Sequence, residues 1–144
     1  MPSDNFEECA KRHLDDANFL FKNNRLDNAM HLAGFAVECS LKFAVKHYQG
    51  YGLRDPRAHY KHKVHLIATD LIRTLSLLPN SSAYSILNQI QPPRNPGHPL
   101  HGHPDRRYWS SGYWSQSNVR DAIKLAQDVY QKIVVPIQTL GRLP

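Results

Sequence analysis

The segment HLAGFAVECSLKFAVKH, residues 31–47, decides how this chain is expected to fold. Its apolar residues recur at intervals of three and four, the spacing that places side chains on one face of an α-helix. The pattern predicts one long helix from about Leu26 to Tyr48, on which Glu38 and Lys42 form an i,i+4 ion pair of favourable polarity. Small residues crowd one side of this helix: Ala29, Ala33, Gly34 and Ala36. They allow close approach of another helix, either within a bundle or from a second subunit.

The same periodicity predicts further helices on both sides of this segment. We expect them over residues 4–22, about 62–78 and 81–90, and then a long last helix that Ser117 caps and Pro136 kinks. Alternating strand patterns of useful length do not occur in the sequence. The expected fold class is therefore all-α, an up-and-down bundle of four to five helices in a single domain over residues 1–144.

A long loop rich in proline, histidine and arginine separates the last helix from the others, from about residue 91 to residue 116. It contains five of the ten prolines and both tryptophans. A loop of this length in a compact domain is usually either functional or disordered. Its aromatic rings either stack on a ligand or fix the loop to the bundle, and we favour the second role for Trp109 and Trp114.

Positive charge is concentrated in two parts of a chain whose net charge is +6. Residues 41–63 contain six Lys and Arg against Asp55 alone, and residues 94–144 contain seven against three Asp. If the two parts meet in space, they form a positive face that favours phosphate-bearing partners. A solvated basic surface without a partner is the alternative.

Composition indicates a soluble protein, with 41% hydrophobic and 21% charged residues. The sequence has no apolar run long enough to span a bilayer and no secretory signal at its start, so we expect no membrane association. Cys9 and Cys39 lie within apolar helical patterns and are expected to be reduced thiols. The expected location is the cytoplasm.

Histidine is frequent, with nine residues in the chain, and two groups of three stand out: His59, His62 and His65, then His98, His101 and His103. Imidazoles at such spacings are able to bind zinc. The chain has no HExxH motif, however, and no cysteine lies near either group in the sequence. We therefore expect no metal and no other cofactor.

Arginine and histidine together favour chemistry on a phosphodiester. Histidine transfers protons near neutral pH, and a guanidinium holds phosphate oxygens. Arg94 and His101 are separated by six residues, and Asn95 follows the arginine. Basic residues interleaved with aromatic rings suit single-stranded RNA. The candidate residues for binding RNA or a nucleotide are Lys61, Lys63, Arg106, Arg107 and Tyr108.

The segment 31–47 also resembles the central helix of the HEPN superfamily (higher eukaryote and prokaryote nucleotide-binding domains). The resemblance rests on small residues followed by Glu-x-x-Leu-Lys, here Ala33, Val37, Glu38, Leu41 and Lys42. It extends to an acidic first helix, to a histidine that opens the third helix in HKVHLIATDLI, and to RRYW before a long last helix.

This resemblance implies a helical bundle that forms a homodimer about its central helices and acts on RNA or nucleotides. Many members are metal-independent endoribonucleases of toxin–antitoxin or defence type, with an antitoxin partner. Others are non-catalytic modules that bind a nucleotidyltransferase. The catalytic motif of the family is Arg-x(4–6)-His with a polar residue after the arginine, and Arg94, Asn95 and His101 match it. A non-catalytic binding or scaffold module and a plain homodimeric interaction protein are the alternatives.

Overall fold

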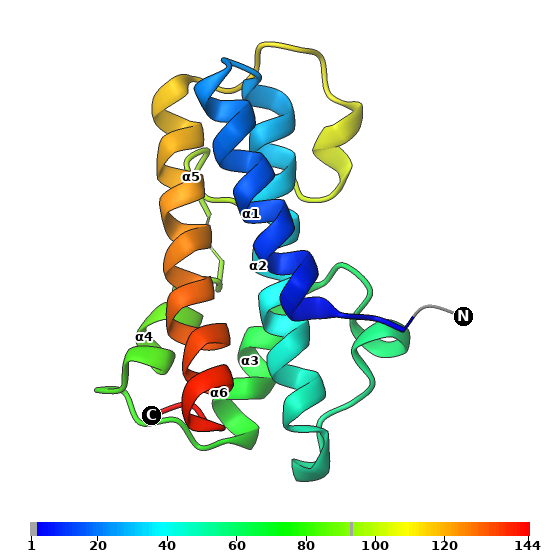
Figure 1. Cartoon of the computed structure of the whole chain (residues 1–144), viewed down its shortest axis with the longest axis vertical. Coiled ribbons are helices and arrows are strands. Elements are labelled where there is room, and N and C mark those ends of the chain that lie inside the picture. The colour runs from blue at the N-terminus through cyan, green and yellow to red at the C-terminus, as the bar shows by residue number, and fades with distance from the viewer. Residues whose placement is uncertain (1–2, 93) are drawn as a thin grey trace.

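The computed structural model describes residues 3–92 and 94–144, except for the side chains of residues 57 and 58. The described residues contain helices and no strands, which confirms the all-α prediction (Figure 1). The α-helices are α1 (Phe6–Lys22), α2 (Leu26–His47), α3 (Val64–Thr74), α4 (Ser82–Asn88), α5 (Gln116–Val129) and α6 (Val135–Leu140). A π-helical turn over Tyr130–Val134 joins α5 to α6, so that the two run on as one long rod.

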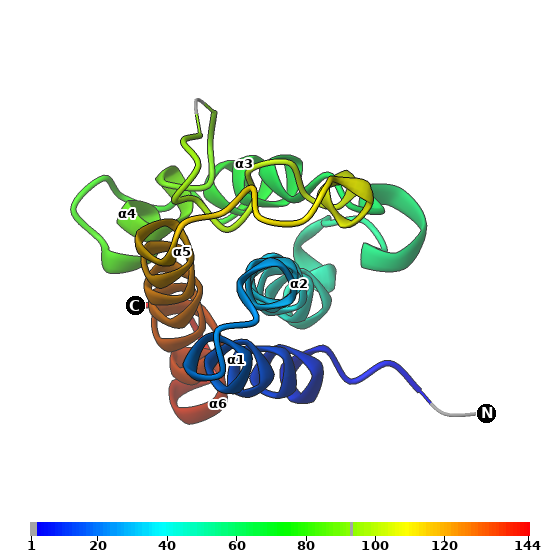
Figure 2. The ribbon, with the colours of Figure 1, turned by 90° about the horizontal axis from the view of Figure 1, so that it is seen from above.

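Helix α2 lies in the middle of the bundle, with α1, α3 and α5 around it (Figure 2). Twelve of its 22 residues are buried, because its sequence is apolar on most of its circumference. Ala29, Ala33 and Ala36 are at most 1% exposed and are in contact with other parts of the same chain. These small side chains allow the close packing of α1 along α2, the most extensive helix contact among the described residues.

Some helix ends differ from the prediction. Ser115, and not Ser117, caps α5: its hydroxyl accepts the N–H of Asn118 at 3.1 Å, and the Asn118 side chain accepts the N–H of Ser115 at 3.3 Å. Both serines are good caps, and only the reciprocal pair distinguishes them. The third helix ends early because Ser76 adopts a left-handed backbone conformation, with φ of 51°.

The loop from residue 91 to residue 116 is packed against the bundle in its described part. Leu100 and Trp114 are 1% and 5% exposed, so Trp114 fills a gap as expected, whereas Trp109 is 41% exposed. His98 is buried in the loop, where its Nε2 donates to the Gln89 carbonyl at 2.7 Å and its Nδ1 accepts the Leu100 N–H at 3.1 Å. The loop therefore packs over α2, and the buried side chains of the loop itself hold it in this conformation.

Gly34 determines how closely this loop approaches α2. A Cβ atom at this position would lie 2.7 Å from His103 Nδ1 and 2.8 Å from the Pro99 carbonyl oxygen. It would also collide with the guanidinium of Arg106. The loop therefore packs directly on the backbone of the central helix, at a position where only glycine leaves room.

Replacement of Gly34 by alanine is expected to lower the free energy of unfolding by about 1–3 kcal/mol, because the loop or the helix must move to admit the methyl group. Gly50→Ala is the matched control, since a Cβ there has no atom within 4 Å. Urea unfolding measures both variants. Equal stability of Gly34→Ala and wild type would contradict the close approach.

Candidate functional site

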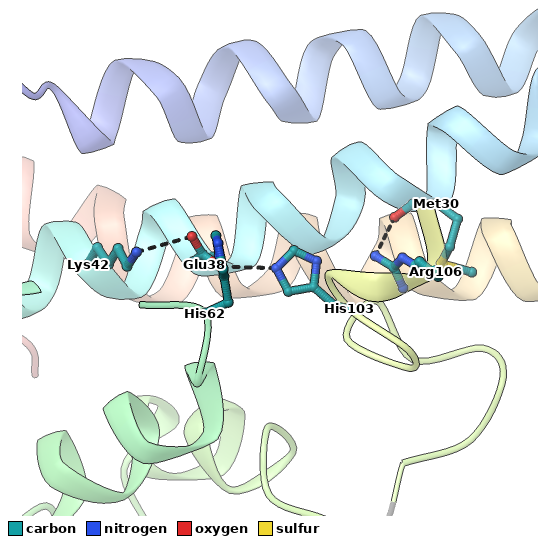
Figure 3. Close-up of polar contacts among 6 residues, drawn as sticks. All are labelled: Met30, Glu38, Lys42, His62, His103 and Arg106. Atoms are coloured by element: carbon teal, nitrogen blue, oxygen red, sulfur yellow. Dashed lines mark hydrogen bonds and ion pairs between the residues drawn. The ribbon is translucent and has the colours of Figure 1, made fainter. Parts of the chain in front are cut away.

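Glu38 lies in the middle of α2, and its carboxylate binds three other side chains (Figure 3). Lys42 Nζ, one turn further along the helix, lies 3.1 Å from Oε2. His62 Nδ1, from the segment before α3, and His103 Nε2, from the loop, each lie 3.0 Å from Oε1. The side chains of Glu38 and His103 are 5% and 1% exposed, and that of His62 is 46% exposed. One carboxylate thus joins three separate parts of the chain.

The protonation of this cluster follows from its surroundings. Burial alone would raise the pKa of Glu38, but the hydrogen bonds from His103 and His62 and the charge of Lys42 lower that pKa to about 2. Burial lowers the pKa of His103, so its ring is neutral near pH 7 and its Nε2–H donates to the carboxylate. The other ring nitrogen of His103 is then buried without a hydrogen-bond partner among the described residues.

Removal of the charge of Glu38 or of Lys42 is expected to destabilise the fold, because the charge of the other residue stays buried without its partner. We expect Glu38→Gln to lower the free energy of unfolding by about 3–5 kcal/mol. In the double variant Glu38→Gln/Lys42→Met the loss should be smaller than the sum of the two single losses, since no unpaired ammonium remains. Guanidinium unfolding of the four proteins gives this coupling. Strictly additive losses would show that the pair is not coupled.

A second feature is a pocket of about 440 Å³ between the start of α2 and the last part of the loop, which we call the first-turn pocket. Its walls include Arg25, His31, Arg107 and Trp109. Among the described residues, no side chain caps the start of α2, so the N–H groups of its first turn have no capping acceptor from that part of the chain. Asp27 closes one side, where its carboxylate accepts the N–H of Gly112 at 3.2 Å.

Arg106 holds the loop against α2 between this pocket and the Glu38 cluster. Its Nη1 donates to the His101 carbonyl at 2.8 Å. Its Nη2 donates to the Met30 carbonyl at 2.7 Å (Figure 3). The guanidinium also lies 5.7 Å from the centre of the Trp114 ring. Burial lowers the pKa of Arg106 to about 9, so the side chain remains charged near neutral pH.

The other candidate binding residues are exposed, in contrast to Arg106, which is 4% exposed. Lys61 and Lys63 lie just before α3. Tyr108 is 76% exposed, and the Arg107 guanidinium lies 4.9 Å from the centre of its ring. These four side chains are therefore free to meet a ligand from solvent, whereas the guanidinium of Arg106 already has two carbonyl partners.

Asn95 and His101 have different neighbours in the described part of the chain. Asn95 lies beside a separate depression next to α5. The ring of His101 is 5.6 Å from that of Trp114, and its Nε2 lies 3.5 Å from the hydroxyl of Tyr113. Within the described part of the chain, no hydrogen bond, ion pair or ring contact joins Arg94 to His101. Their joint action on one phosphate stays a prediction.

The Arg-x(4–6)-His spacing has further occurrences that the prediction from the sequence did not consider. The spacing also occurs at Arg25 and His31, at Arg54 and His59, and at Arg57 and His62. In the first of these pairs, both residues line the first-turn pocket. The signal was present in the sequence, but the spacing alone does not show that Arg25 and His31 share a wall.

Comparison of the chain with protein-family models, with curated proteins and with solved structures finds no match in any of the three. The resemblance to the HEPN superfamily therefore rests on the sequence features given above. None of the described helices combines the length and the apolar character that crossing a bilayer requires.

Proposed function

We propose that this protein binds RNA or a nucleotide in the first-turn pocket. The observation that carries the proposal is the composition of that one pocket, which combines an uncapped helix start, Arg25 and Arg107 on its walls, and a partly exposed Trp109. The uncapped helix start and the two arginines suit a phosphate, and the ring of Trp109 suits a stacked base.

A phosphate would be held at the start of α2. The N–H groups of an uncapped first turn and the positive end of the helix dipole attract anions. Arg25 and Arg107 are both exposed and both line the pocket, so both guanidinium groups are available to a phosphate there. Asp27 is the one acidic residue in the pocket wall, and Gly112 already occupies one of its carboxylate oxygens.

The sugar and base would lie further inside. Burial and the positive charge of Arg106 lower the pKa of His31 to about 4, so its ring is neutral near pH 7. Its Nδ1 is buried without a partner among the described residues. A ribose hydroxyl or a base edge would bond this nitrogen once the ring turns towards the pocket. The exposed face of Trp109 offers a platform for stacking.

A longer strand would continue along the basic face towards α3. Glu38, which binds the segment that carries Lys61 and Lys63, lies eight residues from Met30, or about 12 Å along the axis of α2. Arg106 binds the carbonyl of Met30 beside the first-turn pocket. The segments that carry Lys61, Lys63 and Arg107 therefore both lie against α2, about 12 Å apart along its axis. This arrangement supports an extended positive face.

Cleavage of the bound RNA is the second candidate activity, and the position of Arg25 and His31 in one pocket favours it. In metal-independent cleavage, an arginine holds the phosphate while a histidine accepts the proton of the ribose 2′-hydroxyl and returns it to the leaving 5′-oxygen. The expected homodimer and the expected nucleotidyltransferase or antitoxin partner stay predictions of the family resemblance.

Binding of a labelled single-stranded RNA should be sensitive to salt, and fluorescence anisotropy over a series of salt concentrations measures it. Arg25→Ala/Arg107→Ala should weaken binding at least tenfold and lower the slope of log K against log salt by about 1.4, from about 0.7 for each lost phosphate contact. The control is Arg142→Ala, which changes an exposed arginine near the C-terminus, at the other end of the bundle (Figure 1).

Unchanged affinity of the Arg25/Arg107 double variant would contradict the proposed pocket. Incubation of the same RNA with micromolar protein in EDTA then separates binding from cleavage. His31→Ala and His101→Ala, assayed side by side, identify the histidine on which cleavage depends. RNA that stays intact with the wild-type protein limits the function to binding.

A further inference from the structure

We propose that Glu38, His62 and His103 form a binding site for a divalent transition-metal ion, with zinc as the best fit. Each residue offers one ligand atom, and the three atoms all lie within 4.8 Å of one another. The proposal is independent of the first-turn pocket and of RNA. It reverses the expectation from the sequence, which considered two groups of histidines separately, because this site takes one histidine from each group.

The distances between the ligand atoms suit a small ion. Oε1 of Glu38 is 3.0 Å from His62 Nδ1 and 3.0 Å from His103 Nε2. Zinc bonds of about 2.0–2.2 Å at tetrahedral angles separate neighbouring ligand atoms by about 3.3–3.5 Å. The two histidine nitrogens lie within 4.8 Å of each other. An ion between the three atoms therefore lengthens the two contacts of Glu38 by a few tenths of an ångström and draws the two imidazole nitrogens together by at most about 1.5 Å. Rotation of the half-exposed His62 side chain supplies a movement of that size.

The donor set indicates the class of metal. Two imidazole nitrogens and one carboxylate oxygen suit zinc and neighbouring first-row ions, whereas magnesium and calcium prefer oxygen ligands alone. Lys42 contacts Oε2, the other oxygen of Glu38, at 3.1 Å. It thereby orients the carboxylate so that Oε1 faces both histidines, as partners outside the ligand set commonly do in metal sites.

A fourth ligand, such as a water molecule or a substrate atom, would approach the ion from the side of His62. Glu38 and His103 are inside, while the half-exposed side chain of His62 lies at the surface. The ring of Phe35 forms an apolar wall, with its centre 4.6 Å from that of His103 and 5.9 Å from that of His62. Three protein ligands with one open position are typical of zinc sites that bind water or a substrate atom.

The test uses the full chain, stripped with a chelator and then titrated with Co²⁺ as a spectroscopic probe and with Zn²⁺ as its competitor. We expect one Co²⁺ per chain, a visible absorption band of a four-coordinate ion, and its displacement by Zn²⁺. His62→Ala should raise the dissociation constant at least tenfold, since one of three protein ligands is lost. His59→Ala is the matched control, because this neighbouring histidine is exposed and lies outside the cluster.

A melting curve without metal checks that His62→Ala is folded, which its exposed position favours. If that variant fails to fold, His62→Gln tests the same loss of a ligand in the same titration, since it keeps a polar side chain beside Glu38 but removes the imidazole. Absence of saturable Co²⁺ binding by the wild-type protein would overturn the proposal. Equal affinity of the His62→Ala variant and wild type, or a loss of binding in His59→Ala of the same size, would overturn it as well. RNA binding measured in EDTA is unaffected by either outcome.

Discussion

The arrangement of this molecule depends on the contacts that the buried carboxylate of Glu38 makes with other side chains. An ionised carboxylate inside a protein is very unfavourable unless charges and hydrogen bonds compensate for the water that it loses. Here the compensation comes from Lys42 on the same helix and from His62 and His103 on two other segments. The start of α3 and the long loop must therefore both reach the middle of α2 for the carboxylate to be satisfied.

The absence of a side chain at Gly34 allows the long loop to reach the middle of α2. Because the loop lies directly on the helix backbone, the guanidinium of Arg106 is able to reach the Met30 carbonyl at 2.7 Å. The same contact places Arg107 and Trp109 beside the start of α2, where the first-turn pocket forms. The constraint that fixes the loop thus also assembles the proposed binding surface, and it leaves the Glu38 cluster open on the side of His62.

The sequence predicted the helices well because their signal is local: three- and four-residue spacing, caps and prolines all act within one or two turns. The loop could not be predicted in the same way, because its contacts join residues that are 65 and 76 positions apart. Glu38 and Lys42 were recognised as a favourable helix pair, but nothing in their neighbourhood shows that both are buried. His103 was grouped with its sequence neighbours, whereas its partner lies on α2.

Hydrogen–deuterium exchange of the wild-type protein and the Glu38→Gln variant tests the central claim most directly, because it reports on the backbone of the loop itself. If Glu38 holds the loop, amides between residues 98 and 106 should lose at least tenfold more protection in the variant than the slowest amides of α1, which lose only what the lower global stability accounts for. Loop amides that keep their wild-type protection, or that lose no more than those of α1, would contradict the account.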